Sequence, residues 1–344
     1  STASPVGRFA PISRQDRNNG TFSKQNFHTL TILPTRYIMS WILHSRYCTF
    51  IQKPRHHTPA MFKRKKETIM SKLRYHIAVM AAKFSKVIIR LSGRNGTHTP
   101  GVVARKICPD FMAQAPKAPL CICVTGTNGK TTVSNMLTDM LEKEGKKVVS
   151  NRTGSNIVPG CVTNLLNSVN WLGKCRVDAT VFEVDERASR LILPYVKPDY
   201  LVVTNLFRDS LKRNAHPDYI FSVIDTYCPD TTKLILNADE QCSSNLKPNS
   251  EHVYFGIGKQ DDDKTEPYNL IADYTLCPKC GTKLKFNYLR YHHIGNAYCP
   301  NCDYKSADAD YLATKVDKEG KKLIVREKDG NEIEYALIHD ALFN

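Results

Sequence analysis

The chain has 344 residues, of which 41% are hydrophobic and 24% are charged, so it can bury a full core and is not a peptide, a fibre or a wholly disordered protein. Its net charge of +16 is concentrated at one end, because residues 1–110 hold 20 of the 49 Lys and Arg residues but three acidic residues. The rest of the chain is nearly neutral, so the overall basicity is weak evidence for nucleic-acid binding.

The first part of the chain divides into a leader and a helix. Residues 1–69 are basic and without clear periodicity, which favours a disordered leader, a gene-model artefact or an organellar targeting segment. Residues 70–115 are expected to hold an amphipathic basic helix and a linker, and the helix is predicted over 71–92. Either this helix packs on the following domain with its lysines extended to water, or it contacts an anionic membrane surface. Its apolar residues recur at helical spacing: Leu73, Ile77, Met80, Ala81, Phe84, Ile88 and Leu91.

No stretch of the sequence predicts a membrane-spanning helix, since the best candidate, residues 37–51, is interrupted by His44 and Arg46. Most of the 12 cysteines follow no short spacing, and Cys121 and Cys123 lie in an apolar run where buried thiols act as small hydrophobic side chains. A reducing, cytoplasmic location is the simpler interpretation of this pattern.

From residue 120 the sequence alternates between short apolar strands and helices. A helix is predicted over 132–144, and strands are predicted over 120–124, 147–150, 179–184, 200–204, 233–236 and 252–255. This alternation predicts an α/β domain over residues 116–344, with a mostly parallel sheet covered on both faces. After residue 263, Glu319-Gly320 and Asp329-Gly330 indicate hairpin turns between further strands.

A glycine-rich segment lies at the first transition from strand to helix, and it predicts a phosphate-binding turn. Its candidate ligands are Gly126, Thr127, Asn128, Gly129, Lys130, Thr131 and Thr132. Glycines let backbone N–H groups surround phosphate oxygens, the lysine neutralises terminal phosphates, and a threonine hydroxyl can bind Mg²⁺. The loop is two residues shorter than the general P-loop pattern, but its position after a buried strand favours nucleotide binding.

The magnesium ion needs a carboxylate as well, and the run Val181 to Glu186 offers one. Glu183 and Asp185 follow a predicted strand, and active sites of parallel sheets form at the carboxyl ends of strands. The alternative is a solvated acidic strand end with no metal role.

Two C-x-x-C pairs predict a structural zinc site in an insert at about residues 274–305. The four candidate ligands are Cys277, Cys280, Cys299 and Cys302. Four thiolates close a tetrahedral Zn²⁺ site with no open position for water. Two disulfides are the rival interpretation, and His292 and His293 are alternative ligands. Basic and aromatic residues between the pairs resemble a nucleic-acid-binding ribbon, although such residues also cover the thin core of a small ribbon.

With these motifs in place, the sequence resembles the Mur ligase family, and within it the MurT-type subunits of lipid II isoglutaminyl synthase. The resemblance covers roughly residues 70–344. Its motifs are Gly126–Thr132, the acidic strand end Glu183–Glu186, Thr204–Asp209, Leu236–Asp239 and the ribbon inserted after Tyr254-Phe255-Gly256. The short phosphate loop is the form that Mur ligases have, whereas the ribbon is absent from most of them.

The resemblance implies ATP-dependent amidation of the D-glutamate α-carboxylate in the lipid II stem peptide, through an acyl phosphate. Lys130 and Glu183 would be catalytic, Thr131 and Glu183 would hold Mg²⁺, and Asn237 and Asp239 would lie near the adenosine. A GatD-type glutaminase would supply ammonia, and no nucleic-acid partner is expected. The enzyme would be cytoplasmic and peripheral at the inner face of the plasma membrane, where the lipid-linked substrate lies.

Two departures from the family pattern leave alternatives open. Lys212–His216 replaces an expected acidic and arginine-containing segment, and the chain is expected to lack the family's carboxy-terminal domain after Asn344. The alternative interpretations are therefore another Mur-type peptide ligase, a truncated inactive homologue and a zinc-ribbon nucleic-acid-binding P-loop protein. Salt-dependent DNA binding that survives deletion of residues 1–69 would favour the last of these.

Overall fold

The computed structural model describes residues 60–93, 96–152, 155–206, 217–266, 274–291, 293–317 and 319–336, and their side chains from Met70 onward. The chain divides into two compact units, Ser1–Phe62 and Lys63–Asn344, and the second holds the elements that form the site. The predicted leader over residues 1–69 lies outside the described residues as far as Pro59, and from Ala60 the chain is helical.

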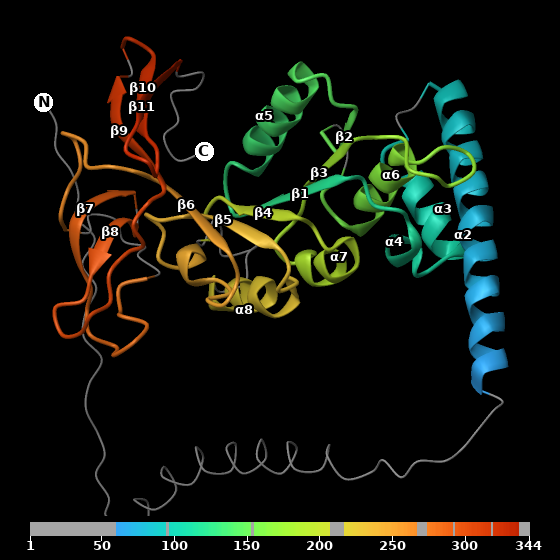
Figure 1. Cartoon of the computed structure of the whole chain (residues 1–344), viewed down its shortest axis with the longest axis horizontal. Helices are drawn as coiled ribbons and strands as arrows, with labels where there is room; N and C mark the ends of the chain where they lie inside the picture. The colour runs from blue at the N-terminus through green and yellow to red at the C-terminus, as the bar shows by residue number, and fades with distance from the viewer. Residues whose placement is uncertain are drawn as a thin grey trace, which may run out of the picture. The chain divides into compact units, whose positions relative to one another are not determined.

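One large sheet forms the centre of the second unit (Figure 1). Its strands are β1 (Leu120–Thr125), β2 (Val148–Ser150), β3 (Ala179–Glu183), β4 (Tyr200–Val203), β5 (Lys233–Asn237), β6 (His252–Ile257), β9 (Tyr311–Asp317), β10 (Lys322–Arg326) and β11 (Glu332–Ala336). Their order across the sheet is β11-β10-β9-β6-β5-β4-β1-β3-β2.

The sheet is mostly parallel, as the alternation of strands and helices predicts. Every neighbouring pair from β2 across to β9 is parallel, whereas β9, β10 and β11 pair antiparallel through tight turns. These turns contain Glu319-Gly320 and Asp329-Gly330, so both predicted hairpins are confirmed. The carboxyl ends of β1, β3, β4, β5 and β6 consequently meet along one edge, where a ligand site can form.

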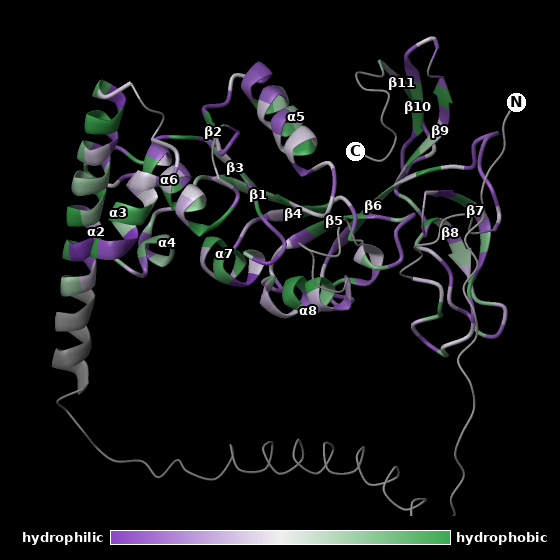
Figure 2. Cartoon of the chain, turned by 180° about the vertical axis from the view of Figure 1, so that it is seen from behind, coloured by the Kyte–Doolittle hydropathy of each residue, from purple (hydrophilic) through white to green (hydrophobic). Residues whose placement is uncertain are grey.

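Helices cover both faces of the parallel part, since β1 is buried on both sides. On one face, α5 (Lys130–Lys143) packs on Ile122 and Val124. On the other, Cys121 and Cys123 face a core built with α6 (Val158–Ser168), α7 (Ser189–Val196) and α8 (Pro217–Tyr227). Both cysteines are buried, as predicted. Figure 2 shows the hydrophobic residues along β1 and β3 that a strand covered on both faces requires.

Three helices precede the sheet: α2 (Ala60–Leu91), α3 (Thr99–Ile107) and α4 (Phe111–Gln114). The predicted amphipathic helix is confirmed, but it begins at Ala60 rather than at residue 71. The added segment is rich in strong helix formers and follows Pro59, a residue type that suits the start of a helix. None of the described helices is both long and apolar enough to cross a bilayer.

The cysteine-rich insert lies in the crossover connection between β6 and β9. It contains the antiparallel hairpin of β7 (Lys285–Tyr291) and β8 (Ile294–Tyr298), with one C-x-x-C pair on each side. A small core of its own includes Leu284, Phe286 and Ala297. The insert, called the ribbon below (residues 274–305), is therefore a packed unit placed at the end of β6.

Candidate active site

The glycine-rich turn lies at the predicted place, between the end of β1 and the start of α5. Gly126 has a φ of +132°, and a Cβ atom at this position would lie 2.2 Å from the Thr204 hydroxyl oxygen. Gly129 has a φ of +82° and directly precedes Lys130, the first residue of α5. Position 126 thus needs glycine because the neighbouring strand approaches closely, and position 129 needs it because the backbone is left-handed.

Two residues that follow β4 fix the shape of this turn. The backbone N–H of Thr127 donates to the Asn205 carbonyl over 2.7 Å, and that of Asn128 donates to Asn205 Oδ1 over 3.0 Å. The Thr204 hydroxyl donates to the Asn128 carbonyl over 2.5 Å. Because β4 pairs with β1, the turn is braced by the adjacent strand and presents the positive end of α5 to the site.

Lys130 folds back over the turn that it follows. Its ammonium group donates to the carbonyls of Gly126 and Thr127 and to Glu186 Oε1, which lies 3.0 Å away. Both side chains of this ion pair are mostly buried. Burial raises the pKa of Glu186, and the charge of Lys130 partly opposes that shift. The carboxylate therefore holds the cation over the turn, where it can exchange to the oxygens of an incoming phosphate.

The two residues predicted to bind magnesium meet at hydrogen-bond distance. The Thr131 hydroxyl donates to Glu183 Oε2 over 2.9 Å, which brings the first turn of α5 to the end of β3. Asn151 holds the backbone of Glu183 on both sides, with bonds of 2.7 and 2.8 Å. A hydroxyl and a carboxylate oxygen are hard ligands of the kind that Mg²⁺ takes, so these residues fit the ion.

The neighbouring acidic residue Asp185 serves another purpose. Its Oδ1 accepts the backbone N–H groups of Arg187 and Ala188 over 3.0 and 3.1 Å, directly before α7. Of the two carboxylates that the sequence offered for the metal, Glu183 thus lies beside the phosphate turn, and Asp185 closes the turn that leads into α7. Thr132 lies half-buried in the first turn of α5, one residue beyond the magnesium pair.

A largely apolar cavity of about 390 Å³ opens beside the turn. Its walls include Val133 and Leu137 of α5, Ile235 of β5 and Phe255 of β6. Asn237 and Asp239, the residues expected near the adenosine, also line it. The cavity has the size and composition of small-molecule sites, with few polar groups among hydrophobic walls.

Asn237 and Asp239 contribute to this cavity in different ways. Asn237 joins two strand ends, because its Nδ2 donates to the Thr204 carbonyl over 3.0 Å. The carboxylate of Asp239 accepts the backbone N–H of Ile257 over 2.7 Å and the Tyr288 hydroxyl over 3.0 Å. Burial raises its pKa, although these bonds act in the other direction. Asp239 therefore lines the cavity while its carboxylate binds β6 and the ribbon.

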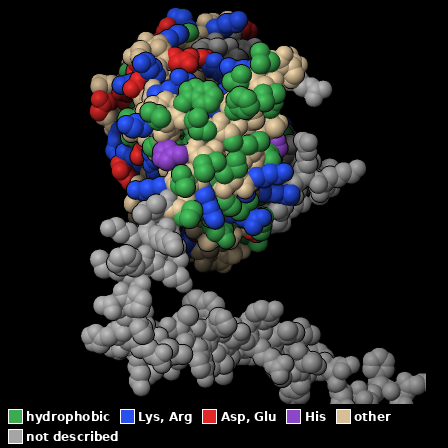
Figure 3. Space-filling view, turned by 90° about the vertical axis from the view of Figure 1, so that its right-hand side faces the viewer, with side chains coloured by type: hydrophobic (Ala, Val, Ile, Leu, Met, Phe, Trp, Pro, Cys, Tyr) green, Lys and Arg blue, Asp and Glu red, His purple; other side chains and the backbone are tan. Residues whose placement is uncertain are grey.

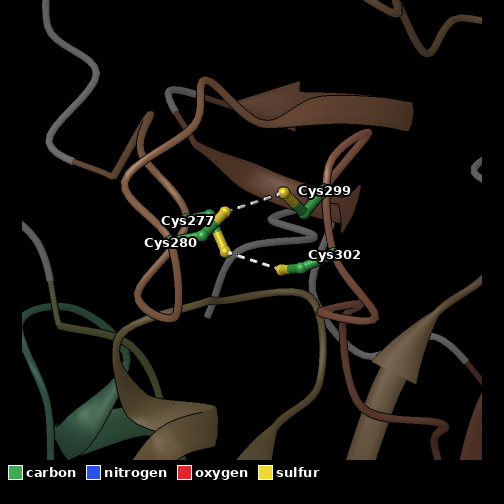
Figure 4. Close-up of side chains that lie close together, drawn as sticks. All are labelled: Cys277, Cys280, Cys299 and Cys302. Carbon is green, nitrogen blue, oxygen red and sulfur yellow. Dashed lines mark hydrogen bonds between the residues drawn. The ribbon is translucent and has the colours of Figure 1, made fainter.

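The four ribbon cysteines point toward one another (Figure 4), and all their sulfur atoms lie within 4.8 Å. The Sγ atoms of Cys277 and Cys302 are 3.5 Å apart, as are those of Cys280 and Cys299. These separations are too long for disulfides and close to the ~3.8 Å between thiolates that share one tetrahedral zinc. None of the described cysteines forms a disulfide. The donor set thus fits a closed metal site.

His293 is not among this group of cysteines and has a different partner. Its ring is buried, and Nε2 lies 3.0 Å from Glu240 Oε1. Glu240 also accepts the backbone N–H groups of Leu206, Cys242 and Ser243. Burial alone would raise the pKa of Glu240, but the bonds from His293 and Ser243 hold it below its usual value. A buried carboxylate thereby joins the ribbon to the loops after β4 and β5.

The ribbon forms one wall of the apolar cavity. Arg290 of β7 and Ile294 of β8 line it, opposite α5. Arg290 donates to Asp263 Oδ2 over 2.6 Å and to the Gly258 carbonyl over 3.0 Å, so its guanidinium is held in place. The Gly295 N–H donates to the Asp239 carbonyl over 2.7 Å. Tyr288 and Arg290, which resembled nucleic-acid contacts in the sequence, thus bind residues of the α/β domain.

Comparison with known proteins decides the family. The model of the Mur ligase middle domain matches residues 124–298, about half of the chain. The chain belongs to the Mur ligase family. The matched range runs from the end of β1 to the end of β8 within the ribbon, so it contains the phosphate turn, the Thr131–Glu183 pair and the residues that line the cavity.

Individual relatives extend this match. The subunit MurT of lipid II isoglutaminyl synthase (glutamine-hydrolyzing) from Staphylococcus aureus strain COL is 30% identical over 71% of this chain and 55% of its own length. The Streptococcus pneumoniae subunit MurT is 28% identical over 71% of this chain and 54% of its own. The chain therefore spans about half the length of the curated relatives it matches.

A solved structure supports the fold assignment. The pseudomurein peptide ligase type C from Methanothermus fervidus has a TM-score of 0.55 and 24% identity, over 69% of this chain and 46% of that one. The predicted α/β fold with a mostly parallel sheet is thus that of the Mur ligases.

Two residues of this Mur ligase site, Glu186 and Glu240, receive no role from the sequence pattern. Glu186 stood in the acidic run but had no assigned role, although it pairs with Lys130. Glu240 follows the predicted Asn237 and Asp239, and no local pattern indicates its contact with His293, 53 positions away. The divergent segment Lys212–His216 lies outside the described residues.

Proposed function

We propose that this Mur ligase chain supplies the ATP-binding part of an enzyme that amidates the D-glutamate α-carboxylate of the lipid II stem peptide, giving D-isoglutamine. The observation that carries the proposal is the meeting of Thr131 and Glu183 beside the phosphate turn and the apolar cavity. The relatives named lipid II isoglutaminyl synthase support this choice among Mur-type reactions.

In this proposal each part of the site receives one part of the nucleotide. The turn from Gly126 to Gly129 and the start of α5 bind the phosphates, and the apolar cavity takes the adenosine. Lys130 leaves the turn carbonyls and Glu186 to neutralise the terminal phosphate. Thr131 and Glu183 would hold Mg²⁺, which when bound neutralises phosphate charge during transfer.

The reaction needs ATP because a carboxylate does not react with ammonia. A carboxylate oxygen of D-glutamate attacks the γ-phosphorus, the bond to the bridging oxygen breaks, and ADP leaves. Ammonia then attacks the acyl carbon of the resulting acyl phosphate, and phosphate departs with one proton from the nitrogen. Lys130 stabilises charge on the transferring phosphoryl group, which is the main catalytic need in such a step.

The ammonia and the acceptor come from elsewhere in the proposed complex. The relatives are named as subunits of a glutamine-hydrolyzing enzyme, which supports a GatD-type glutaminase as the source of ammonia. The acceptor would be lipid II, so the enzyme would be cytoplasmic and peripheral at the inner face of the plasma membrane. We further propose that the cysteine group holds a structural Zn²⁺, since four thiolates leave no position for a reacting water.

Two measurements test this function. Calorimetry with a non-hydrolysable ATP analogue should give Mg²⁺-dependent binding that Glu183→Gln weakens, while Asp185→Asn leaves it much less affected because the Asp185 carboxylate bonds the backbone of the turn before α7. Amidation of lipid II should then be measured with a glutaminase, using the chain alone and joined to the carboxy-terminal part of the Staphylococcus relative.

The expected product in the amidation assay is D-isoglutamine, formed only with ATP and with glutamine or ammonium. Product formed with a free amino acid in place of ammonia would instead identify a peptide ligase. Failure to bind the analogue at any magnesium concentration would overturn the proposal at its first step.

A further inference from the structure

The outer face of α2 carries a continuous apolar stripe. Tyr75, Ala78, Val79 and Ala82 on the inner face are buried against the domain. The side chains at intervals of three and four along the opposite face are exposed: Leu73, Ile77, Met80, Phe84, Ile88 and Leu91. Phe84 is 62% exposed and Leu91 is 83% exposed. Figure 3 shows hydrophobic side chains gathered on this side of the molecule, with Lys and Arg around them.

A second segment extends the apolar surface. The turn at residues 170–173 presents Trp171 and Leu172, which are 48% and 66% exposed. It is fixed to α2, because the Tyr75 hydroxyl donates to the Gly173 carbonyl over 3.0 Å and Lys83 Nζ lies 5.9 Å from the centre of the Trp171 ring. A tryptophan with one side open beside a basic group is typical of the interface between water and lipid.

The charges that this part of α2 itself carries are of one sign. From Met70 to Leu91 the helix contains Lys72, Arg74, Lys83, Lys86 and Arg90 and no acidic residue. The membrane-facing surface proposed below consists of this outer face of α2 together with the turn at residues 170–173, and is called the α2 face. Its only charged members are cations, so it complements an anionic surface.

A cavity of about 240 Å³ lies at the edge of the α2 face, and four cations border it. They are Lys83, Lys86, Arg90 and Arg176, and no acidic residue is among the described lining residues. Lys83 Nζ donates to the carbonyls of Leu166 and Val169 over 2.9 and 2.8 Å, at the end of α6. The C-terminus of a helix supplies about half a negative charge, which is less than the four positive charges gathered here.

The electrostatics of Lys83 agree with this excess of positive charge. Burial, and then the neighbouring Arg176 and Lys86, lower the pKa of Lys83 to about 8. Burial, and then the neighbouring Arg90 and Arg176, lower the pKa of Lys86. An anion in the cavity would relieve this repulsion, and a phosphate group has the size and charge to do so.

We propose that the α2 face docks on an anionic lipid bilayer, with Phe84 and Trp171 among the acyl chains and a lipid phosphate in the cavity bordered by Arg90 and Arg176. A second copy of the chain is a poorer occupant, because two such faces would oppose Lys72, Arg74 and Arg90 to one another. The inference stands on the α2 face itself and rests on the proposed function only for the benefit of meeting a lipid-linked substrate.

Vesicle flotation of the full chain tests the proposal. The chain should bind vesicles of phosphatidylglycerol and phosphatidylcholine in equal parts, bind pure phosphatidylcholine far less, and dissociate as salt rises. Because residues 1–59 are also basic, the decisive comparison is between point variants of the full chain. Phe84→Glu should lower binding about tenfold or more, and Arg90→Gln about fivefold.

Matched variants on α5 serve as controls, since that helix lies on the sheet rather than on the α2 face. Met140→Glu changes a side chain that is 59% exposed, and Lys143→Gln removes an exposed charge, so both should bind vesicles like the unchanged chain. Circular dichroism and affinity for an ATP analogue should be the same for all four variants, because none of these residues supports the core or the nucleotide site.

Three results would overturn the inference. If the Phe84→Glu and Arg90→Gln variants float with vesicles like the unchanged chain, lipid binding belongs to another segment. If these variants lose a dimer or a glutaminase complex but still bind vesicles, the α2 face is a protein-binding surface. If inorganic phosphate occupies the cavity as tightly as phosphatidylglycerol vesicles do, the cavity is a site for free anions. The vesicles contain neither nucleotide nor lipid II, so failure of amidation would not affect these results.

Discussion

The two halves of the candidate nucleotide site are built in opposite ways. The phosphate half comes from one continuous segment, Gly126–Thr132, which needs the ends of β3 and β4 to complete it. The half proposed for the adenosine, called the adenosine half below, is a cavity whose walls come from α5, β5, β6 and the ribbon, so it brings together residues separated by more than 100 positions. The phosphate half therefore depends on local backbone, and the adenosine half depends on how the ribbon is attached.

This difference predicts that a substitution in one half should weaken ligand binding by that half and leave binding by the other half unchanged. The phosphate turn is braced by Thr204 and Asn205 and has no direct bond to the ribbon among those that the structure describes. The ribbon is attached to the segment after β5, because Tyr288, His293 and Gly295 bond to Asp239 and Glu240. Inorganic tripolyphosphate and ADP are suitable probes, because the first needs one half and the second needs both.

The largest effect is expected when the phosphate half is broken by Lys130→Met. The change removes the cation that would neutralise the terminal phosphate, so the amidation rate should fall about 10²- to 10³-fold. Affinity for tripolyphosphate and for ADP should fall together, as calorimetry can show. Lys143→Met, at the exposed end of α5, is the matched control and should leave both unchanged. If Lys130→Met binds tripolyphosphate as tightly as the unchanged chain, the turn is not the phosphate-binding site.

The phosphate half is also the half that the sequence predicts well. A buried strand, two glycines with special backbone and a helix start within a few residues of one another, so local rules suffice to place Lys130 and Thr131. Glu183 could be added because the ends of parallel strands meet at one edge of a sheet. The same rules could not separate Glu183 from Asp185, since the choice depends on which carboxylate bonds the backbone of the turn before α7.

The adenosine half could be predicted only in part. The four cysteines were evident from their spacing, and their grouping is confirmed. Asn237 and Asp239 came from the family resemblance, and they do line the cavity. The placement of Arg290 and Ile294 in its wall depends on how the β7–β8 hairpin docks, and the Glu240–His293 contact that helps to fix this docking has no local sequence signal.

The start of α2 was also missed, because periodicity marks a buried face and not the full length of a helix.

The next largest effect should come from breaking the ribbon, which tests whether the adenosine half fails alone. Cys302→Ser removes one ligand of the proposed zinc site, and the loosened hairpin should lower ADP affinity about tenfold. Tripolyphosphate affinity should stay within about twofold, since the turn is braced elsewhere. Cys175→Ser, at a cysteine of similar exposure outside the ribbon, is the control. Equal losses for both probes would show that the halves are coupled.

A smaller change sharpens the comparison within the cavity wall. Ile294→Val removes one methylene from a buried side chain that lines the cavity, so ADP affinity should fall about fourfold. Tripolyphosphate affinity should be unaffected, because Ile294 is remote from the phosphate turn in the proposed arrangement. Ile324→Val on β10 makes the same change outside the cavity and should alter neither affinity. An ADP affinity equal to that of the unchanged chain would place the adenosine elsewhere.

The smallest effect concerns how firmly the ribbon is held as the pH falls. The pKa of Glu240 is lower in the folded chain than its usual value, so the folded state binds fewer protons than the unfolded state at this group. Its stabilising contribution is therefore full above the unfolded pKa of about 4.3 and is lost as the pH falls through the lower folded value. The difference in unfolding free energy between the unchanged chain and Glu240→Gln should shrink over that range and stay constant near neutral pH. A difference that grows as the pH falls would mean that the carboxylate is not held ionised by His293 and the backbone of Ser243, and the docking of the ribbon would then need another explanation.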